Sequence, residues 1–512
     1  MSDERHPGWQ RATVVLLVVA TMLRLHLLTT IELVPDEAYY WDWSRHLSWG
    51  YYDQGPMVAY VIRATTLLFG NTEFGVRFGV CAASLVALVC SYVVAKQMFS
   101  PLAGFVTVLA MSVTPLVTVG SLIATYDPLL VCFWALMIVC LYRALFAADH
   151  RRQCQAWYWC GVSLGCGFLS KHTMLLAVPC ILLFLLISPV HRFWLRRPQP
   201  YIALGVALLL YGGVFWWNAQ HHWWTFGHLL FLTKKGGSTP PRRLGDFVAS
   251  QALLLGPGLF LGCLVAMRRA VRTREARQVF LMCLGLPILV FFCLMTWKTR
   301  VQANWAPCAW LTPTILWAGW MSEELTRSRV KRSRRAVLAV TTIVLLSGFL
   351  TFALLVPEAR AMLGVHLTPD KDVTNTAYGW RRLAGHVERM RREMQSGGRR
   401  VFVAGNGYQY AALMAFYLPD HPITYDLFLH FRLTMYAAYV ADLKRHLGED
   451  CIFINAGEAD DSDLRSIFTR VEWQRPFAIW RHPLYAGPIA MIHIAKCYGY
   501  RRYVGLTWAS GG

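Results

Sequence analysis

Apolar runs of roughly 20 residues recur through this chain and are separated by polar connections, the length that a helix needs to span a bilayer. The chain has 512 residues, of which only 15% are charged. Soluble domains usually carry about 25% charged residues. The sequence therefore predicts an all-α polytopic membrane bundle. We expect about eleven spans, at residues 12–30, 75–98, 102–120, 127–147, 157–169, 174–189, 201–217, 247–267, 279–296, 304–320 and 336–356.

The basic residues between the apolar runs indicate the orientation of the bundle. Counting spans places the basic connections on the same side as the N-terminus; they include Arg151–Arg152, Arg192–Arg197, Arg268–Arg277 and Arg327–Arg335. Cytoplasmic loops carry an excess of Lys and Arg, so we expect a cytoplasmic N-terminus with an uncleaved first helix. The net charge of +21 then reflects topology and contact with anionic lipids, and no nucleic-acid module is present.

Two regions on the side opposite to the basic connections do not span the membrane. The first loop, 31–74, contains the apolar stretch 57–69, which is too short to cross a membrane and is typical of an interfacial helix. Region 357–512 has no spanning run. Residues 401–404, 451–454, 477–480 and 490–498 there favour strands, and 408–417 and 438–446 favour helices.

These patterns divide the chain into a transmembrane domain, 1–356, and a small extracytoplasmic (periplasmic) α/β domain, 357–512. An odd number of spans places the second domain outside the cytoplasm. Cys451 and Cys497 both lie in it, and a disulfide between them is a hypothesis motivated by the oxidising compartment.

Carboxylates at the outer ends of spans are the candidate catalytic residues: Asp36, Glu37, Asp53 and Asp127. Acidic side chains are disfavoured near a bilayer, so such residues suggest function. They could act as a general base or stabilise a cationic transition state. The alternative is that Asp36 and Glu37 are a solvated loop start that helps to fix topology.

Cations on the same face are candidates for binding a phosphate: Lys171, Lys298 and Arg300. The alternative for Lys171 is a lysine that snorkels to the interface. His221, His222 and His228 could bind a metal, although their Trp-rich surroundings also suit an interfacial belt. We assign no metal ligands and no definite cofactor, and leave a divalent metal ion open.

Several motifs follow one another along the chain. They begin with Pro35-Asp36-Glu37-Ala38-Tyr39-Tyr40, Tyr52-Asp53-Gln54-Gly55-Pro56-Met57, Tyr126-Asp127-Pro128-Leu129 and the Gly-rich 165–173 ending in Lys171-His172-Thr173. They continue with Arg300-Val301-Gln302-Ala303-Asn304-Trp305-Ala306-Pro307, Gly407-Tyr408-Gln409-Tyr410-Ala411-Ala412 and Phe416-Tyr417-Leu418-Pro419. Together these motifs resemble bacterial GT-C glycosyltransferases that use polyprenyl-phosphate sugars, a family that includes protein mannosyltransferase-like enzymes, aminoarabinose transferases and galacturonosyltransferases. Gln54 departs from the lysine of the aminoarabinose enzymes, which puts the same donor sugar in doubt.

The resemblance implies transfer of a sugar from a polyprenyl-phosphate donor to a lipid or glycolipid acceptor, such as lipid A, at the outer face of the cell inner membrane. It favours Asp36 as the base and implies a substrate groove with Tyr39, Tyr52, Asn304 and Trp305. The expected partners are the lipid-linked sugar, the acceptor and membrane lipids, with no nucleic acid. A protein O-mannosyltransferase-like enzyme and a polysaccharide polymerase or ligase stay open, and a lipid flippase or transporter is less favoured because no internal repeat is found.

Overall fold

The computed structural model describes residues 7–232, 238–327, 330–427, 434–457 and 462–501. The chain divides into two compact units. The first unit comprises Met1–Leu28, Ser48–Val61 and Arg77–Leu355. The second comprises Thr29–Leu47, Ile62–Val76 and Val356–Gly512. Two segments of the first loop are therefore grouped with the C-terminal region.

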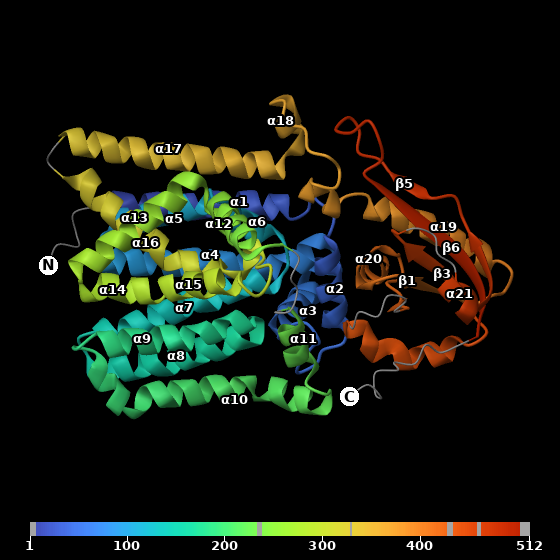
Figure 1. Ribbon diagram of the computed structural model, residues 1–512, viewed down its shortest axis with the longest axis horizontal. Helices are drawn as coiled ribbons and strands as arrows, with labels where there is room; N and C mark the ends of the chain where they lie inside the picture. Colours follow the sequence, from blue (N-terminus) through green and yellow to red (C-terminus); the bar gives the residue numbers. More distant parts are fainter. Residues whose placement is uncertain (1–6, 233–237, 328–329, 428–433, 458–461, 502–512) are drawn as a thin grey trace. The chain divides into compact units, whose positions relative to one another are not determined.

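The first unit is a bundle of helices (Figure 1). Its elements are α1 (Pro7–Leu27), α4 (Glu73–Met98), α5 (Pro101–Ser112), α6 (Pro115–Leu122), α7 (Tyr126–Phe146), α8 (His150–Ser170), η1 (His172–Leu176), α9 (Ala177–Ile187), η2 (Arg192–Arg196), α10 (Pro198–Gln220), α11 (Trp224–Leu232), α12 (Pro240–Leu255), α13 (Pro257–Thr273), α14 (Ala276–Cys283), α15 (Leu286–Met295), η3 (Ala303–Trp305), η4 (Pro307–Trp310), α16 (Leu311–Thr326) and α17 (Val330–Leu355). The unit boundaries fall inside α3 (Met57–Phe69) and near the start of α4.

Within the described residues, six helices are long and apolar enough to cross a membrane, and up to eight if each of two bent pairs counts as one span. The six are Gly8–Leu27, Glu73–Met98, Tyr126–Phe146, Pro198–Gln220, Ala276–Met295 and Val330–Leu355. A membrane bundle is thus confirmed. The segments expected at 157–169, 174–189 and 304–320 are helical but are not in this set.

The prediction of one continuous helix was wrong for two spans. In 102–120 the chain bends by 64° between α5 and α6, and in 247–267 it bends by 104° between α12 and α13. Pro115 and Pro257 begin the second helix of each pair. Proline lacks the backbone N–H that would continue the preceding helix, and Gly256 adopts a φ of 84°, which turns the chain.

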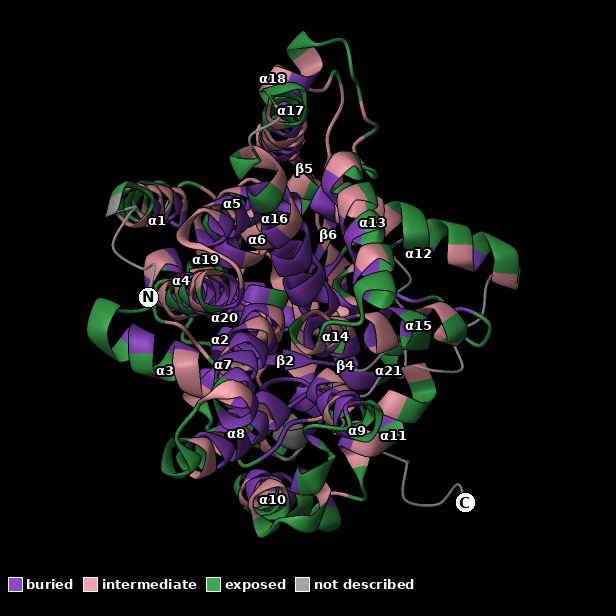
Figure 2. Ribbon diagram, turned by 90° about the vertical axis from the view of Figure 1, so that its left-hand side faces the viewer, coloured by how far each residue is buried: buried purple, intermediate pink, exposed green. Residues whose placement is uncertain are grey.

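The core of the first unit lies between its central helices. Buried residues are concentrated in α7 and α16, whereas α10 and α12 carry many exposed ones (Figure 2). Helices α7, α8 and α10 lie side by side (Figure 1). The packing of α8 on α10 depends on Gly161, because a Cβ there would lie 2.4 Å from the carbonyl oxygen of Ala203.

The second unit contains a six-stranded sheet ordered β2-β1-β3-β6-β4, with β5 paired to β6. The strands are β1 (Val401–Gly405), β2 (Thr424–Asp426), β3 (Asp450–Asn455), β4 (Phe468–Trp473), β5 (Phe477–Ile479) and β6 (Ala490–Tyr500). Strand β1 is parallel to β2 and β3, and β6 is antiparallel to its neighbours. The predicted strands 401–404, 451–454, 477–480 and 490–498 are confirmed as β1, β3, β5 and β6.

Helices complete the second unit: α2 (Pro35–Arg45), α18 (Pro357–Met362), η5 (Val373–Ala377), α19 (Trp380–Gln395), α20 (Tyr408–Tyr417), η6 (Met435–His446) and α21 (Ser462–Ile467). The predicted helix 408–417 is confirmed as α20. Residues Cys451 and Cys497 face each other across β3 and β6. Both are free thiols, so the structure does not contain the disulfide proposed between them.

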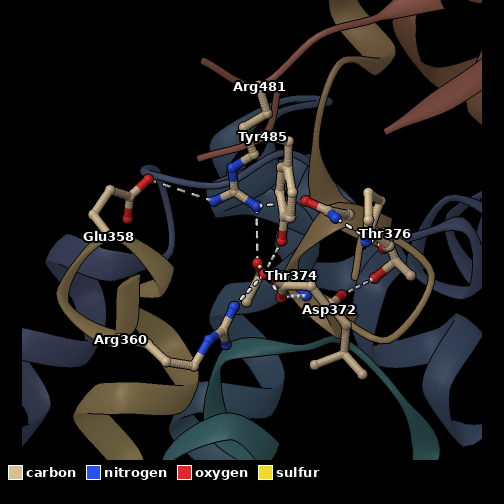
Figure 3. Close-up of polar contacts among 10 residues, drawn as sticks. Glu358, Arg360, Asp372, Thr374, Thr376, Arg481 and Tyr485 are labelled. Atoms are coloured by element: carbon tan, nitrogen blue, oxygen red, sulfur yellow. Dashed lines mark hydrogen bonds and ion pairs between the residues drawn. The ribbon is translucent and has the colours of Figure 1, made fainter. Parts of the chain in front are cut away.

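A polar cluster around the buried Asp372 joins α18, the loop after it and the chain before β6 (Figure 3). The guanidinium of Arg360 pairs with the buried carboxylate of Asp372, which also accepts a hydrogen bond from the Tyr485 hydroxyl at 2.5 Å. Arg481 donates to the Thr374 hydroxyl at 2.8 Å and to the Asn375 side chain at 2.9 Å. We call this set the Asp372 cluster.

Candidate active site

A carboxylate, an ammonium group and an amide meet in the first unit. The Lys171 ammonium donates to one oxygen of Asp127 at 2.6 Å and to the backbone carbonyl of Asn304 at 3.2 Å. The side-chain amide of Asn304 donates to the other oxygen of Asp127 at 2.8 Å. The side chains of Lys171 and Asp127 are only 6% and 13% exposed. The structure thus brings together three residues that the sequence selected separately, and we call them the Asp127 cluster.

The residues of the Asp127 cluster lie at the ends of helices, which fixes their positions. Asp127 lies in the first turn of α7, where the helix dipole favours a negative charge. Lys171 is the C-cap of α8, where a positive charge is favoured, and its ammonium also lies 5.0 Å from the centroid of the Tyr126 ring. Asn304 belongs to η3, in the turn before α16.

An apolar cavity of about 300 Å³ adjoins the Asp127 cluster, and Asp127 and Asn304 are among its polar lining groups. Its wall is otherwise mostly aliphatic and comes from α4, α5, α6, α7, α12, α13 and α16, with Leu88, Leu116, Val131, Leu255 and Leu311 among the lining residues. A polar group at the edge of an apolar cavity suits a ligand with one charged end and one hydrocarbon end.

The part of the first loop in the first unit lies against the end of α8. Asp53 pairs with the imidazole of His228 at 3.7 Å, and the ring of Tyr52 packs on His228 with centroids 4.9 Å apart. Gly55 allows this approach, because a Cβ there would lie 2.1 Å from the carbonyl oxygen of Leu169. Asp53 and Tyr52 are therefore placed by residues of α8 and α11.

Two buried residues to which the sequence assigned no role, His172 and Tyr211, lie beside them. The ring nitrogens of His172 contact the Gln54 side chain at 2.9 Å and the Tyr211 hydroxyl at 2.8 Å. Gln54 thus contacts an imidazole at the position where the aminoarabinose-like motif has lysine. The position of His172 directly after Lys171 was the signal that could have drawn attention to it.

Within the described ranges, no group of three or more His, Cys, Asp or Glu side chains gathers to hold a metal ion. Of the three histidines considered from the sequence, His228 pairs with Asp53, and His221 stacks on Trp217 with ring centroids 4.1 Å apart. His222 is exposed.

The remaining predicted cations, Lys298 and Arg300, occupy a loop beside a second cavity. Arg300 and Trp305 line a cavity of about 640 Å³ together with Asp246 and Ser250 of α12. Lys298 and Arg300 are exposed, and the structure gives neither side chain an ion pair with a described residue. Arg243 holds this loop by donating to the carbonyl oxygens of Trp297 at 3.0 Å and Lys298 at 3.4 Å.

Asp36, Glu37 and Tyr39 lie on α2 in the second unit and have different environments. Glu37 is fully buried, and its carboxylate accepts a hydrogen bond from the Val34 backbone N–H at 2.9 Å, which caps the helix. Asp36 is exposed and accepts a hydrogen bond from the Tyr408 hydroxyl at 2.9 Å. The two adjacent carboxylates point to different surroundings, as expected on a helix.

Aromatic rings surround α2 in the second unit. The Tyr39 ring lies 4.5 Å from that of Tyr408, and the Tyr39 hydroxyl accepts a hydrogen bond from the Met435 N–H at 2.7 Å. The buried Asp42, which sequence reasoning missed, accepts a hydrogen bond from Tyr436 at 2.7 Å. Burial raises the pKa of Asp42, and nearby Arg45 opposes that shift.

The chain has the GT-C glycosyltransferase fold. Its structure matches ArnT from Cupriavidus metallidurans with a TM-score of 0.66 at 14% identity, covering 95% of this chain and 98% of that one. The archaeal oligosaccharyltransferase AglB from Archaeoglobus fulgidus matches with a TM-score of 0.54 at 12% identity, covering 87% of this chain and 69% of that one.

Relatives by sequence carry the names of particular transferases. Residues 53–217 match the family model described as dolichyl-phosphate-mannose-protein mannosyltransferase. Lipid A galacturonosyltransferase RgtD of Rhizobium johnstonii is 32% identical over 289 residues, which are 56% of this chain and 60% of that protein. An undecaprenyl phosphate-alpha-4-amino-4-deoxy-L-arabinose arabinosyl transferase of Proteus mirabilis is 28% identical over 163 residues, 29% of either chain.

Each of these two alignments covers less than two thirds of the length of the relative. The resemblance predicted from the motifs is confirmed in its fold and in these sequence relationships.

Proposed function

We propose that this chain is an integral-membrane glycosyltransferase that moves a sugar from a polyprenyl-phosphate donor to an envelope acceptor. The observation that carries this proposal is the Asp127 cluster at the edge of an apolar cavity, within a GT-C fold. A polyprenyl phosphate has one anionic end and one hydrocarbon end, which this combination suits. The matched ArnT structure includes a form bound to undecaprenyl phosphate.

The reaction requires a base, a leaving group and a displacement. The acceptor hydroxyl oxygen attacks the anomeric carbon of the donor, the bond from that carbon to the phosphate oxygen breaks, and the phosphate leaves with the electron pair. Asp36 takes the hydroxyl proton, and its hydrogen bond from Tyr408 orients the carboxylate. A single displacement inverts the anomeric centre.

The other predicted residues take supporting roles in this proposal. Lys171, Lys298 and Arg300 neutralise the leaving phosphate. Asp53 and Asp127 orient the sugar or the acceptor, and Glu37 stabilises the start of α2. The aromatic and amide groups of the substrate groove, Tyr39, Tyr52, Asn304 and Trp305, bind the sugar and lipid portions.

The acceptor is proposed to be lipid A or another lipopolysaccharide component, because two relatives are named for lipid A galacturonosyl transfer and for aminoarabinosyl transfer from undecaprenyl phosphate. The second candidate is a protein O-mannosyltransferase-like enzyme, which the family description favours. A polymerase or ligase would use the same class of donor.

The proposed location is the cell inner membrane, with about eleven spans, a cytoplasmic N-terminus and a periplasmic region 357–512. The proposed domains are the transmembrane domain 1–356 and the α/β domain 357–512. The basic connections support this orientation, since they include Arg268–Arg277, from the last turns of α13 to the start of α14, and Arg327–Arg335 after α16. Reporter fusions after α13 and within α19 would test it, because the proposal places them on opposite sides.

A transfer assay with purified protein, a polyprenyl-phosphate sugar and lipid A tests the activity. Asp36→Asn is expected to abolish transfer, because an amide cannot accept the hydroxyl proton. Tyr408→Phe, which removes only the hydrogen bond to Asp36, is expected to lower kcat by roughly tenfold.

The matched control is Asp370→Asn, since Asp370 is another exposed carboxylate of the second unit and has no proposed role. Full transfer by the Asp36→Asn variant would contradict the role of the base. Mass spectrometry of envelope glycolipids from cells with and without the gene identifies the sugar and the acceptor.

A further inference from the structure

A groove runs between α7 and α8 in the first unit, away from the candidate active site. Its volume is about 900 Å³, and its apolar part is lined by Phe133, Leu136 and Cys140 of α7 and by Trp159, Val162 and Cys166 of α8. Trp159 is 65% exposed and the other residues of this set are half-buried, so the groove opens to the side of the bundle. Cys140 and Cys166 have small side chains, and the space that larger side chains would fill stays open as the groove.

The groove ends in two cations. Arg143 and Arg152 both line it, with Gln155 beside them. They lie at the same end because α7 ends at Phe146 and α8 begins at His150. The N-terminus of α8 adds its partial positive charge at this end.

These cations are only weakly neutralised by the protein. The side chain of Arg143 is exposed and forms no ion pair or hydrogen bond with another described residue. Arg152 pairs with Asp149 at 3.6 Å, but both side chains are more than half exposed, which makes the pair weak. The Asp149 carboxylate also caps α8 through the Arg151 N–H at 3.0 Å. The end of the groove therefore stays net positive.

We propose that this groove binds an anionic phospholipid. Its phosphate lies between Arg143 and Arg152, and one acyl chain lies along the apolar part toward Phe133. Residues 133–146 of α7 extend over about 20 Å at 1.5 Å per residue, which is close to the length of an extended fatty acyl chain. Charge complementarity selects an anionic headgroup over a zwitterionic one.

The position of the headgroup separates this ligand from the proposed donor. The Asp127 cluster lies at the start of α7 and the end of α8, whereas Arg143 and Arg152 lie at the opposite ends of the same helices. From Asp127 to Arg143 the helix rises by about 24 Å. The headgroup therefore lies at the other membrane surface, which the proposed topology makes the cytoplasmic one.

Native mass spectrometry of the full-length protein in detergent, titrated with phosphatidylglycerol or phosphatidylcholine, tests the proposal. The unchanged protein is expected to bind phosphatidylglycerol more tightly than phosphatidylcholine. The double variant Arg143→Gln/Arg152→Gln is expected to lose about thirtyfold in affinity for phosphatidylglycerol, the effect of two cations near an anionic lipid. Val162→Trp fills the groove without changing its charge and is expected to weaken the binding of both lipids.

The matched control is Arg334→Gln/Arg335→Gln, which removes the same charge from two exposed arginines of α17. Retention of phosphatidylglycerol selectivity by the Arg143→Gln/Arg152→Gln variant would overturn the proposal, as would an equal loss in the control. Titration with undecaprenyl phosphate separates the two ligands. If the groove variants lost binding of that lipid and kept phosphatidylglycerol, the groove would belong to the donor.

Discussion

Lys171 has two partners that are far away in the sequence. Asp127 lies 44 residues before it and Asn304 lies 133 residues after it. Motif spacing selected each residue separately, but their hydrogen bonds depend on how α7, α8 and η3 pack. The contact between Asp36 and Tyr408, 372 residues apart, was equally out of reach. The sequence therefore predicted the types of residue in the candidate site better than their partners.

A double-mutant cycle on Lys171 and Asp127 tests the buried pair. Lys171→Met is expected to destabilise the protein by about 3 kcal/mol, because it leaves a buried carboxylate without its ammonium partner. Asp127→Asn keeps an acceptor for Asn304 and should also destabilise, since the ammonium is then uncompensated. The double variant should lose clearly less stability than the sum of the two single variants.

Unfolding in detergent with a graded denaturant, followed by Trp fluorescence, gives the free energy of unfolding of each of the three variants relative to the unchanged protein. Strictly additive losses would mean that the ion pair contributes no coupling in the folded protein. A lysine at an exposed helix end, such as Lys331, provides a comparison in which Lys→Met should change little.

At the scale of elements, apolar periodicity predicted helices well and their continuity poorly. The expected helix 57–69 matches α3 (Met57–Phe69), because a short apolar run bounded by Gly and Pro has few alternatives. The predicted spans 102–120 and 247–267 both bend at a proline. The mean hydropathy of a segment is insensitive to one proline, whereas the helical backbone hydrogen bonds are interrupted by it.

The Asp372 cluster makes the stability of α18 and η5 depend on pH. Burial raises the pKa of Asp372, but hydrogen bonds from Tyr485, Thr374 and Arg360 outweigh it, and the net effect lowers the pKa below its usual value of 3.8. A carboxyl whose pKa is lower in the folded state stabilises the fold above its unfolded pKa. This contribution is lost as the pH falls through the folded pKa.

Hydrogen exchange of residues 357–377 at pH 7 and near pH 3 measures that loss. Protection is expected to fall on acidification in the unchanged protein. In Asp372→Asn, protection is expected to be low already at pH 7 and to change little with pH. Glu358→Gln is the matched control, because Glu358 contacts the same cluster only through a 3.8 Å ion pair with Arg481 and is largely exposed. Acid sensitivity that survived in Asp372→Asn would assign it to another group.

At the scale of the whole molecule, the chain contributes separate segments to each compact unit. The sequence predicted a boundary near residue 356, because hydropathy changes there. It could not predict that Thr29–Leu47 and Ile62–Val76 belong with the C-terminal region. The signal was present in the aromatic residues of 39–43, which suit either an interfacial belt or a packed core. In the structure Trp41 and Trp43 are 1% exposed.

Region 357–501 should therefore not fold alone. Within the second unit, Trp41 packs on Phe416 at 5.0 Å between ring centroids, and Tyr39 packs on Tyr408. Buried aromatic side chains cover about 150–250 Å² each, so losing Tyr39, Trp41 and Trp43 removes about 15 kcal/mol of apolar burial at 25 cal/mol per Å². That loss is comparable with the whole stability of an ordinary domain, about 5–15 kcal/mol.

Expression of 357–501 with and without residues 29–47, attached through a flexible linker, tests this directly. The isolated region is expected to give poorly dispersed amide resonances and rapid proteolysis, and the fusion is expected to recover both dispersion and protection. A fusion that carries Trp41→Ser/Trp43→Ser keeps the linker and the length but lacks the two largest buried rings, so it should behave like the isolated region. Well-dispersed spectra from 357–501 alone would show that the segment from the first loop adds nothing essential to the core of the second unit.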